Sequence, residues 1–180
     1  MADPYKFHTR RSIRLQDYDY TREGVYFITI CSHEKRCLFG RIDTEMMELN
    51  RYGKIVQACW DEISNHYPQV DLDYFVVMPN HIHGIFVINE GSGMIYHATT
   101  TSSPTKREFS KPIAGSISTI IGTFKAGVTR QINRISEISI KVWQRNYYER
   151  IIRTEEELMQ TRHYIITNPQ NWKKDSLFNS

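Results

Sequence analysis

Two neighbouring strand-like stretches constrain the fold of this chain most strongly. Residues 70–77 and 81–88 are rich in β-branched and aromatic residues, a composition typical of buried strands. The Met78-Pro79-Asn80 sequence between them supplies a proline and an asparagine, which favour a tight turn. We therefore expect residues 70–88 to form a β-hairpin, and the fold must contain an antiparallel strand pair.

Further elements are predicted from apolar periodicity and from capping signals. The expected elements are strands at 24–31, with one or two more within 138–142 and 147–152, and helices at 45–66 and 114–135. Thr154-Glu-Glu-Glu157 has the form of a capping box and opens a final helix that should end near Asn168-Pro169. This order of elements predicts an α+β fold, a ferredoxin-like split βαβ sandwich with a central antiparallel sheet backed by helices, plus a C-terminal helix.

Length and composition indicate one domain over residues 1–180. The chain has 180 residues, of which 40% are hydrophobic, so it can bury one substantial core. We expect the core at about 24–169, with a flexible loop at about 89–110, where Gly, Ser, Thr and Lys dominate. No apolar run is long enough to cross a membrane. The three cysteines lack CxxC spacing and are expected to be free thiols in a reducing cytosol, so we expect a cytoplasmic protein.

Positive charge is concentrated in three segments, 1–14, 106–134 and 141–153. These segments together carry a net charge of +11, although the whole chain carries only +3. Such segregation suits a protein that holds a polyanion, because neutralised phosphates supply most sequence-independent affinity for nucleic acids; solvated helix faces are the alternative. The basic residues expected to contact DNA are Arg10, Arg11, Arg14, Lys125, Arg130, Arg145, Arg150 and Arg153.

His81 and His83 are the first candidates for chemistry. Residues i and i+2 of a strand project from the same face, so the two imidazoles lie side by side while Ile82 points to the opposite layer. Two parallel imidazoles form half of a metal site. A pair of surface or hydrogen-bonded histidines is the alternative, but the Pro-Asn turn directly before the pair favours a metal site.

The final helix carries the second candidate group. Helical spacing places Glu157, Gln160, Tyr164 and Asn168 on one polar stripe. A tyrosine one turn before an amide can bring a phenol nucleophile and an oxygen ligand to one metal ion. The chain has 11 tyrosines, and a tyrosine that packs with its hydroxyl in water is the alternative.

Three motifs in order resemble a known family. They are Val77-Met-Pro-Asn-His81-Ile-His83, Val142-Trp-Gln-Arg-Asn-Tyr-Tyr-Glu-Arg-Ile-Ile-Arg153 and Tyr164-Ile-Ile-Thr-Asn168-Pro169. Together they resemble the HUH single-tyrosine transposases, and in particular the REP-associated tyrosine transposases, over about residues 24–169.

The resemblance implies that His81 and His83 bind a divalent metal, that Asn168 is the third ligand and that Tyr164 is the nucleophile. It implies a DNA transposase or nickase that cuts and rejoins single-stranded DNA through a 5′-phosphotyrosine intermediate and recognises hairpins. Imidazole ligands usually indicate zinc, copper or iron; two histidines with an amide and phosphate oxygens fit Mn²⁺ better, and Mg²⁺ follows from the family. One tyrosine per chain implies a homodimer or two sequential rounds for paired cleavages.

Several alternatives stay open at this point. Tyr147 and Tyr148 are rival nucleophiles, although they lie in a strand-like stretch. A phosphoesterase with paired His-x-Thr/Ser motifs is disfavoured because Gly84 follows His83, and a histidine-triad hydrolase is disfavoured because a third alternate histidine is missing. A catalytically silent hairpin-DNA-binding protein of the same fold is the remaining alternative.

Overall fold

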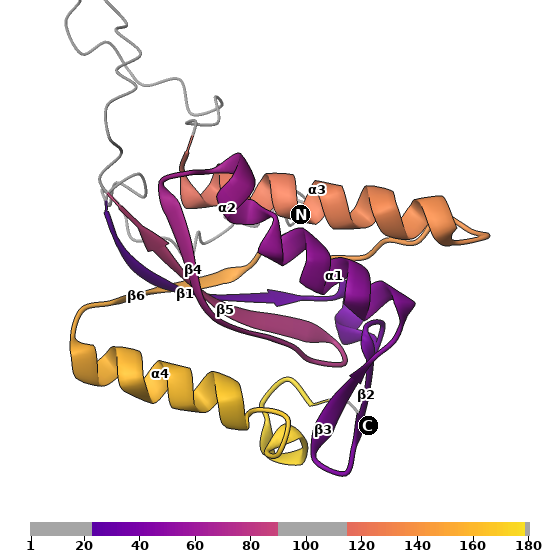
Figure 1. Ribbon diagram of the computed structural model, residues 1–180. Helices are drawn as coiled ribbons and strands as arrows, with labels where there is room; N and C mark the ends of the chain where they lie inside the picture. Colours follow the sequence, from indigo (N-terminus) through magenta and orange to yellow (C-terminus); the bar gives the residue numbers. More distant parts are fainter. Residues whose placement is uncertain (1–22, 90–114, 179–180) are drawn as a thin grey trace, which may run out of the picture.

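A four-stranded antiparallel sheet forms the centre of the protein (Figure 1). The structure is a computed structural model that describes residues 23–89 and 115–178. The sheet consists of β1 (Gly24–Cys31), β4 (Val70–Val77), β5 (His81–Ile88) and β6 (Tyr148–Ile152). Their spatial order is β4-β5-β1-β6. The hairpin predicted at residues 70–88 is confirmed, since β4 and β5 pair antiparallel.

Helices cover both faces of this sheet. Helices α1 (Arg51–Asp61), α2 (Ile63–His66) and α3 (Ile117–Ile135) lie on one side, and α4 (Glu155–Thr167) lies on the other (Figure 1). The first and third of the four strands along the chain, β1 and β5, are central in the sheet, as a split βαβ arrangement requires. The predicted α+β split βαβ sandwich is confirmed.

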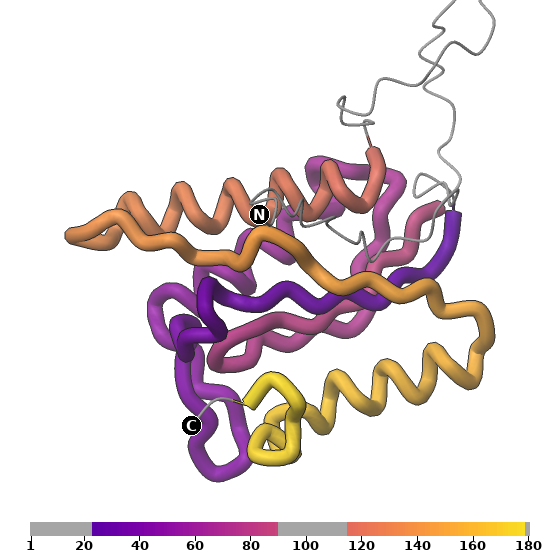
Figure 2. Tube along the Cα trace, turned by 180° about the vertical axis from the view of Figure 1, so that it is seen from behind, coloured from indigo at the N-terminus to yellow at the C-terminus, as the bar shows by residue number. Residues whose placement is uncertain are grey.

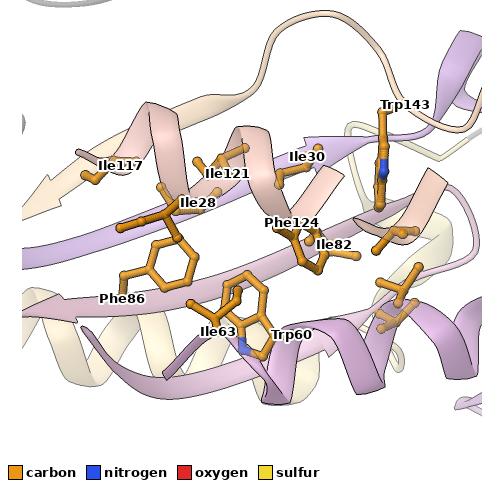
Figure 3. Close-up of a cluster of buried hydrophobic side chains, with 14 of the residues drawn as sticks. Ile28, Ile30, Trp60, Ile63, Ile82, Phe86, Ile117, Ile121, Phe124 and Trp143 are labelled. Atoms are coloured by element: carbon orange, nitrogen blue, oxygen red, sulfur yellow. The ribbon is translucent and has the colours of Figure 1, made fainter. Parts of the chain in front are cut away.

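The main core lies between the sheet and the layer of α1, α2 and α3. Trp60 of α1 stacks on Phe86 of β5 at 4.7 Å and on Phe75 of β4 at 4.2 Å between ring centroids. Gly84 permits this packing, because a Cβ atom there would clash with the Trp60 ring. Figure 3 shows Ile28 and Ile30 of β1 in the same cluster. Alternate residues of each strand therefore face this layer, and the residues between them face α4.

A small second cluster docks α4 on the other face of the sheet. Ile165 of α4 packs with Phe27, Ile85 and Ile152, which come from β1, β5 and β6. The predicted cap at Thr154 is confirmed, because its side chain accepts a hydrogen bond from the Glu157 backbone N–H at 3.1 Å. This docking holds α4 against the histidine face of the sheet.

The helix predicted at 45–66 is wrong at its start. Residues 45–50 are not helical: β2 (Gly40–Asp43) and β3 (Met46–Leu49) form a hairpin, and α1 begins only after Asn50, whose side chain accepts hydrogen bonds from two backbone N–H groups of α1. The apolar Met46 and Leu49 fit the helical period by coincidence. Of the one or two strands predicted within 138–142 and 147–152, the structure has one, β6; the stretch 138–142 is not a strand, and Ile138 is 74% exposed.

Other predicted features concern the loops, the cysteines and membrane helices. Of the loop predicted at 89–110, only Asn89 lies within the described residues. Cys31, Cys37 and Cys59 are free thiols, as predicted. No helix in the described ranges has both the length and the apolar character needed to cross a membrane.

After α4 the chain turns back towards the sheet (Figure 2). A short 3-10 helix, η2 (Trp172–Lys174), follows, and the segment 175–178 comes next. The Asn80 amide nitrogen donates to the Leu177 carbonyl at 2.8 Å. The C-terminal segment is thereby fixed beside the turn between β4 and β5, which is where the histidine pair begins.

Candidate active site

The two histidines lie buried on the face of β5 that is covered by α4. His81 is 0% and His83 is 2% exposed, and their Nε2 atoms are 3.0 Å apart. Burial lowers the pKa of His81 to about 4, and burial together with His81 lowers the pKa of His83 well below 6.5. Both rings are therefore neutral at physiological pH, which is the form that binds metals.

The hydrogen bonds around the pair define the His81 tautomer. His81 Nδ1 lies 2.7 Å from Asn80 Oδ1, while Asn80 Nδ2 donates to the Lys35 and Leu177 carbonyls. Because Asn80 Oδ1 can only accept, His81 Nδ1 carries the proton and Nε2 presents a lone pair. His83 Nδ1 lies 2.8 Å from the Thr29 hydroxyl, which can accept or donate this hydrogen bond. The pair is therefore able to present two Nε2 lone pairs to one cation.

Asp175 completes a three-residue cluster with the histidines. Its side chain is 1% exposed, and Oδ2 lies 3.9 Å from His81 Nε2. One potential ligand atom from each of His81, His83 and Asp175 lies within 4.8 Å of the others. Leu177 N–H donates to Asp175 Oδ1 at 2.6 Å and fixes the carboxylate. Two imidazoles and a carboxylate could hold a divalent metal ion.

Asn168 lies beside Asp175 at the C-terminal end of α4. It is 2% exposed, and its Nδ2 donates to Asp175 Oδ2 at 2.8 Å. Its Oδ1 is buried with no hydrogen-bond partner among the described residues. Buried polar atoms normally have a partner, so a cation bound at the neighbouring histidine–carboxylate cluster would supply one for this oxygen. The donor set, with one or two oxygens beside the imidazoles, therefore suits Mn²⁺ better than the histidines alone do.

Tyr164 faces the cluster from the middle of α4. Its hydroxyl oxygen lies 3.2 Å from His83 Nε2 and donates to Asp175 Oδ2 at 3.4 Å. Its ring contacts the rings of His83 and Phe27. Partial burial and the Asp175 carboxylate raise the pKa of Tyr164 to about 12. A nearby cation opposes that shift, since it stabilises the phenolate.

A bidentate ion pair holds α4 in this position. Arg162, two residues before Tyr164, donates to Asp73 Oδ2 from Nε at 3.0 Å and from Nη2 at 2.7 Å. Asp73 lies where the pairing between β4 and β5 is irregular, between Leu72 and Phe75. The Arg162 guanidinium also lies over the Tyr74 ring, 5.6 Å from its centroid. The contacts of Arg162 with Asp73 and Tyr74 therefore attach the tyrosine helix to the edge strand.

A cleft of about 570 Å³ opens beside Tyr164 and His83. Tyr147 and Tyr148, the rival nucleophiles, also line it. Tyr148 pairs with Thr29, and Thr29 pairs with His83. Tyr148 is therefore two strands away from His83, roughly 10 Å at the usual strand spacing, whereas the Tyr164 hydroxyl is in hydrogen-bond contact with His83.

The basic residues expected to bind DNA occupy different places. Arg150 lines the cleft, and Arg145 and Arg153 are exposed near it, before and after β6. Lys125 is half-buried and donates to the Gln144 and Arg145 carbonyls at 2.6 and 3.1 Å. Arg130 is exposed on α3, in the layer on the other side of the sheet. The remaining three, Arg10, Arg11 and Arg14, lie outside the described residues.

Sequence reasoning missed Asp175, Thr29 and Asn80. No periodicity links Asp175 to the histidines, and only its place between Lys174 and Ser176, beyond the predicted helix, sets it apart. Thr29 could have been found, because it is an isolated polar residue in an otherwise apolar strand. Asn80 was recognised only as a turn residue, although it fixes the His81 ring.

Comparisons with known proteins agree with this fold. No protein-family model matches the chain. A solved structure of a REP-associated tyrosine transposase bound to a REP hairpin is similar, with a TM-score of 0.59 and 16% identity, over 88% of this chain and 74% of that chain. The chain therefore has a transposase-like fold.

A closer relative shows the family. An uncharacterized protein of Haemophilus influenzae is 46% identical over 175 residues, which cover 95% of this chain and 94% of the relative. The chain belongs to the same protein family as this Haemophilus influenzae protein.

Proposed function

We propose that this protein is a metal-dependent DNA transposase or nickase that cuts and rejoins single-stranded DNA, with Tyr164 as the nucleophile. The observation that carries the proposal is the contact between the Tyr164 hydroxyl and His83 Nε2, 3.2 Å apart, beside the His81–His83–Asp175 cluster. The similar transposase structure was determined with a REP hairpin, which supports hairpin DNA as the substrate.

His81, His83 and Asp175 would hold the metal, and Asn168 is a further candidate ligand. Imidazoles alone favour zinc, copper or iron, whereas the added carboxylate favours Mn²⁺ or Mg²⁺. When bound, the metal supplies positive charge that stabilises the phenolate and the scissile phosphate. Asn80 and Thr29 orient the two imidazoles, and Leu177 and Asn168 orient the carboxylate.

Tyr164 forms the covalent bond in this reaction. A phenol is a weak nucleophile at neutral pH, and the positive charge of a bound metal would ease the loss of its proton to water. The phenolic oxygen attacks phosphorus, the bond to the 3′ oxygen breaks, and that oxygen leaves as a 3′-OH after gaining a proton. The product is a 5′-phosphotyrosine link, which keeps the phosphodiester's energy and lets a 3′-OH reverse the step to rejoin strands.

The proposal is tested by adduct formation on a pool of hairpin-bearing oligonucleotides. Wild-type protein should give a covalent protein–DNA adduct on a denaturing gel with Mn²⁺ or Mg²⁺ and none with EDTA. Tyr164→Phe should give none, while the matched control Tyr52→Phe should behave as wild type, since Tyr52 lies on α1, on the other side of the sheet from α4. Hairpin binding without any adduct would favour the catalytically silent alternative.

A further inference from the structure

The cleft beside Tyr164 has the size and position of a ligand site. Its volume of about 570 Å³ lies within the range of roughly 300–1,000 Å³ for small-molecule sites. The nucleophile lies on its wall, together with residues of β1, β6 and the loop before β6. Whatever enters the cleft therefore lies next to the group that reacts.

Aromatic and basic side chains of the sheet form one wall of the cleft. Tyr148 and Arg150 of β6 pair with Thr29 and Phe27 of β1, so all four side chains share the face that carries His83. Tyr148 is 49% exposed and has no ring partner among the described residues. Arg150 uses one N–H group to bind the Thr161 hydroxyl at 3.1 Å, and its other N–H groups have no partner in the described part of the chain. Such a wall offers a stacking surface and free donors.

The loop before β6 adds two amide side chains, on a fixed backbone, to the lining of the cleft. The Gln144 backbone N–H donates to the Cys31 carbonyl at 3.0 Å, and the Lys125 ammonium binds the carbonyls of Gln144 and Arg145. The side chains of Gln144 and Asn146 line the cleft and have no hydrogen-bond partner within residues 23–89 and 115–178. Lys125 thus fixes a loop whose amides remain available to a ligand.

We infer that this cleft binds one unpaired DNA nucleotide next to the scissile phosphate. Its base stacks on Tyr148, its edge is read by Gln144 and Asn146, and Arg150 contacts a phosphate. Proteins commonly hold unpaired bases by stacking them on aromatic rings. An amide side chain can accept a hydrogen bond from adenine N6 and donate one to adenine N7. The inference rests on the proposed function, because it takes the occupant to be the DNA strand that Tyr164 cuts.

The test measures binding without cleavage, in the Tyr164→Phe background and with EDTA. The probes are 5′-fluorescein-labelled hexamers of deoxyadenosine, deoxycytidine or thymidine, followed by fluorescence anisotropy. Tyr148→Leu should weaken all three by about 5- to 150-fold, the effect of removing one base–aromatic stack, whereas Tyr148→Phe should retain affinity. Gln144→Ala and Asn146→Ala should reduce the preference for deoxyadenosine.

Gln131→Ala is the matched control, because Gln131 is an exposed amide on α3, in the layer beyond the sheet. It should leave all three affinities unchanged. The inference would be overturned if the Tyr164→Phe protein bound the hexamers equally well with and without Tyr148→Leu. It would also be overturned if the Tyr164→Phe protein bound no hexamer with a Kd below about 1 mM. Neither result decides the proposed function, because adduct formation by wild type is measured separately.

Discussion

The Asp175 carboxylate accepts a hydrogen bond from the Asn168 amide nitrogen at 2.8 Å. Asp175 therefore stands between the histidine pair and the residue that the sequence motif offers as third ligand. With its nitrogen turned to the carboxylate, Asn168 orients Asp175, and we expect the carboxylate to contribute more to metal binding than the amide does.

Substitution of Asp175 should weaken metal binding more than substitution of Asn168. Removal of groups that only orient a ligand typically costs 10- to 100-fold in affinity, so Asp175→Asn should cost at least about tenfold. Calorimetric titration with Mn²⁺ measures this, with Asp61→Asn on the exposed face of α1 as the matched control. Unchanged affinity in Asp175→Asn and a large loss in Asn168→Ala would return the third position to Asn168.

Stability of the metal-free protein should fall in mild acid. Burial lowers the pKa of His81 to about 4, and that of His83 also lies well below 6.5, whereas the unfolded chain titrates near 6.5. Below that pH the unfolded state binds more protons than the folded state does. The contribution of the two neutral histidines to the free energy of unfolding is therefore complete above about pH 6.5, and it is lost as the pH falls towards the folded-state pKa. Each histidine contributes at most about 1.4 kcal/mol per pH unit.

Urea unfolding with EDTA at pH 5 and pH 7 measures this effect. His83→Gln should show a smaller difference between the two pH values than wild type, and His66→Gln, at an exposed histidine of α2, should not. An equal difference in all three proteins would contradict the buried, neutral state of the pair.

The Arg162–Asp73 pair should position the nucleophile as well as stabilise the protein. Two Arg162 N–H groups donate to Asp73 Oδ2, and the two side chains are 30% and 13% exposed, so Arg162→Ala should cost about 1–2 kcal/mol. It should also lower adduct yield, because α4 is less firmly fixed on β4. A double-mutant cycle with Asp73→Ala in urea, combined with the adduct gel, measures both effects. Arg162→Lys should be more stable than Arg162→Ala, but its adduct yield should recover less, because a lysine ammonium cannot hold the carboxylate with two donors in a fixed geometry.

If adduct yield fell only in proportion to the loss of stability across the Arg162 and Asp73 variants, the pair would have a structural role only. The Glu48–Arg41 pair in the β2–β3 hairpin offers a control. It also joins an arginine to a carboxylate, at 2.8 Å, and it lies far from α4 in sequence, on an exposed hairpin. Arg41→Ala should leave adduct yield unchanged.

The central strands and the histidine pair could be predicted because strand alternation is a local property. In β5, Ile82, Gly84 and Phe86 face one layer while His81 and His83 face the other, and this division is visible in the sequence. The β2–β3 hairpin could not be predicted in the same way. Its turn places Thr44 and Glu45 at positive φ, a conformation usually supplied by Asn-Gly, so no turn signal was present.

The parts of the site that depend on distant segments were also hidden from sequence. Asp175 reaches the histidines only because Asn80 and Leu177 attach the C-terminal segment to the β4–β5 turn. Lys125 was expected to contact DNA from its charge, whereas the structure shows its ammonium bound to two backbone carbonyls. Such contacts follow from tertiary packing, which residue type and spacing do not encode.

The most direct test of the account is to identify the residue that carries DNA in the covalent adduct. The adduct formed with Mn²⁺ is digested with nuclease and trypsin, and the peptides are analysed by mass spectrometry. The account predicts a nucleotide on Tyr164, in the peptide of residues 163–173. A nucleotide on Tyr147 or Tyr148, in the peptide of residues 146–150, would contradict it and assign the nucleophile to β6 or the residue before it.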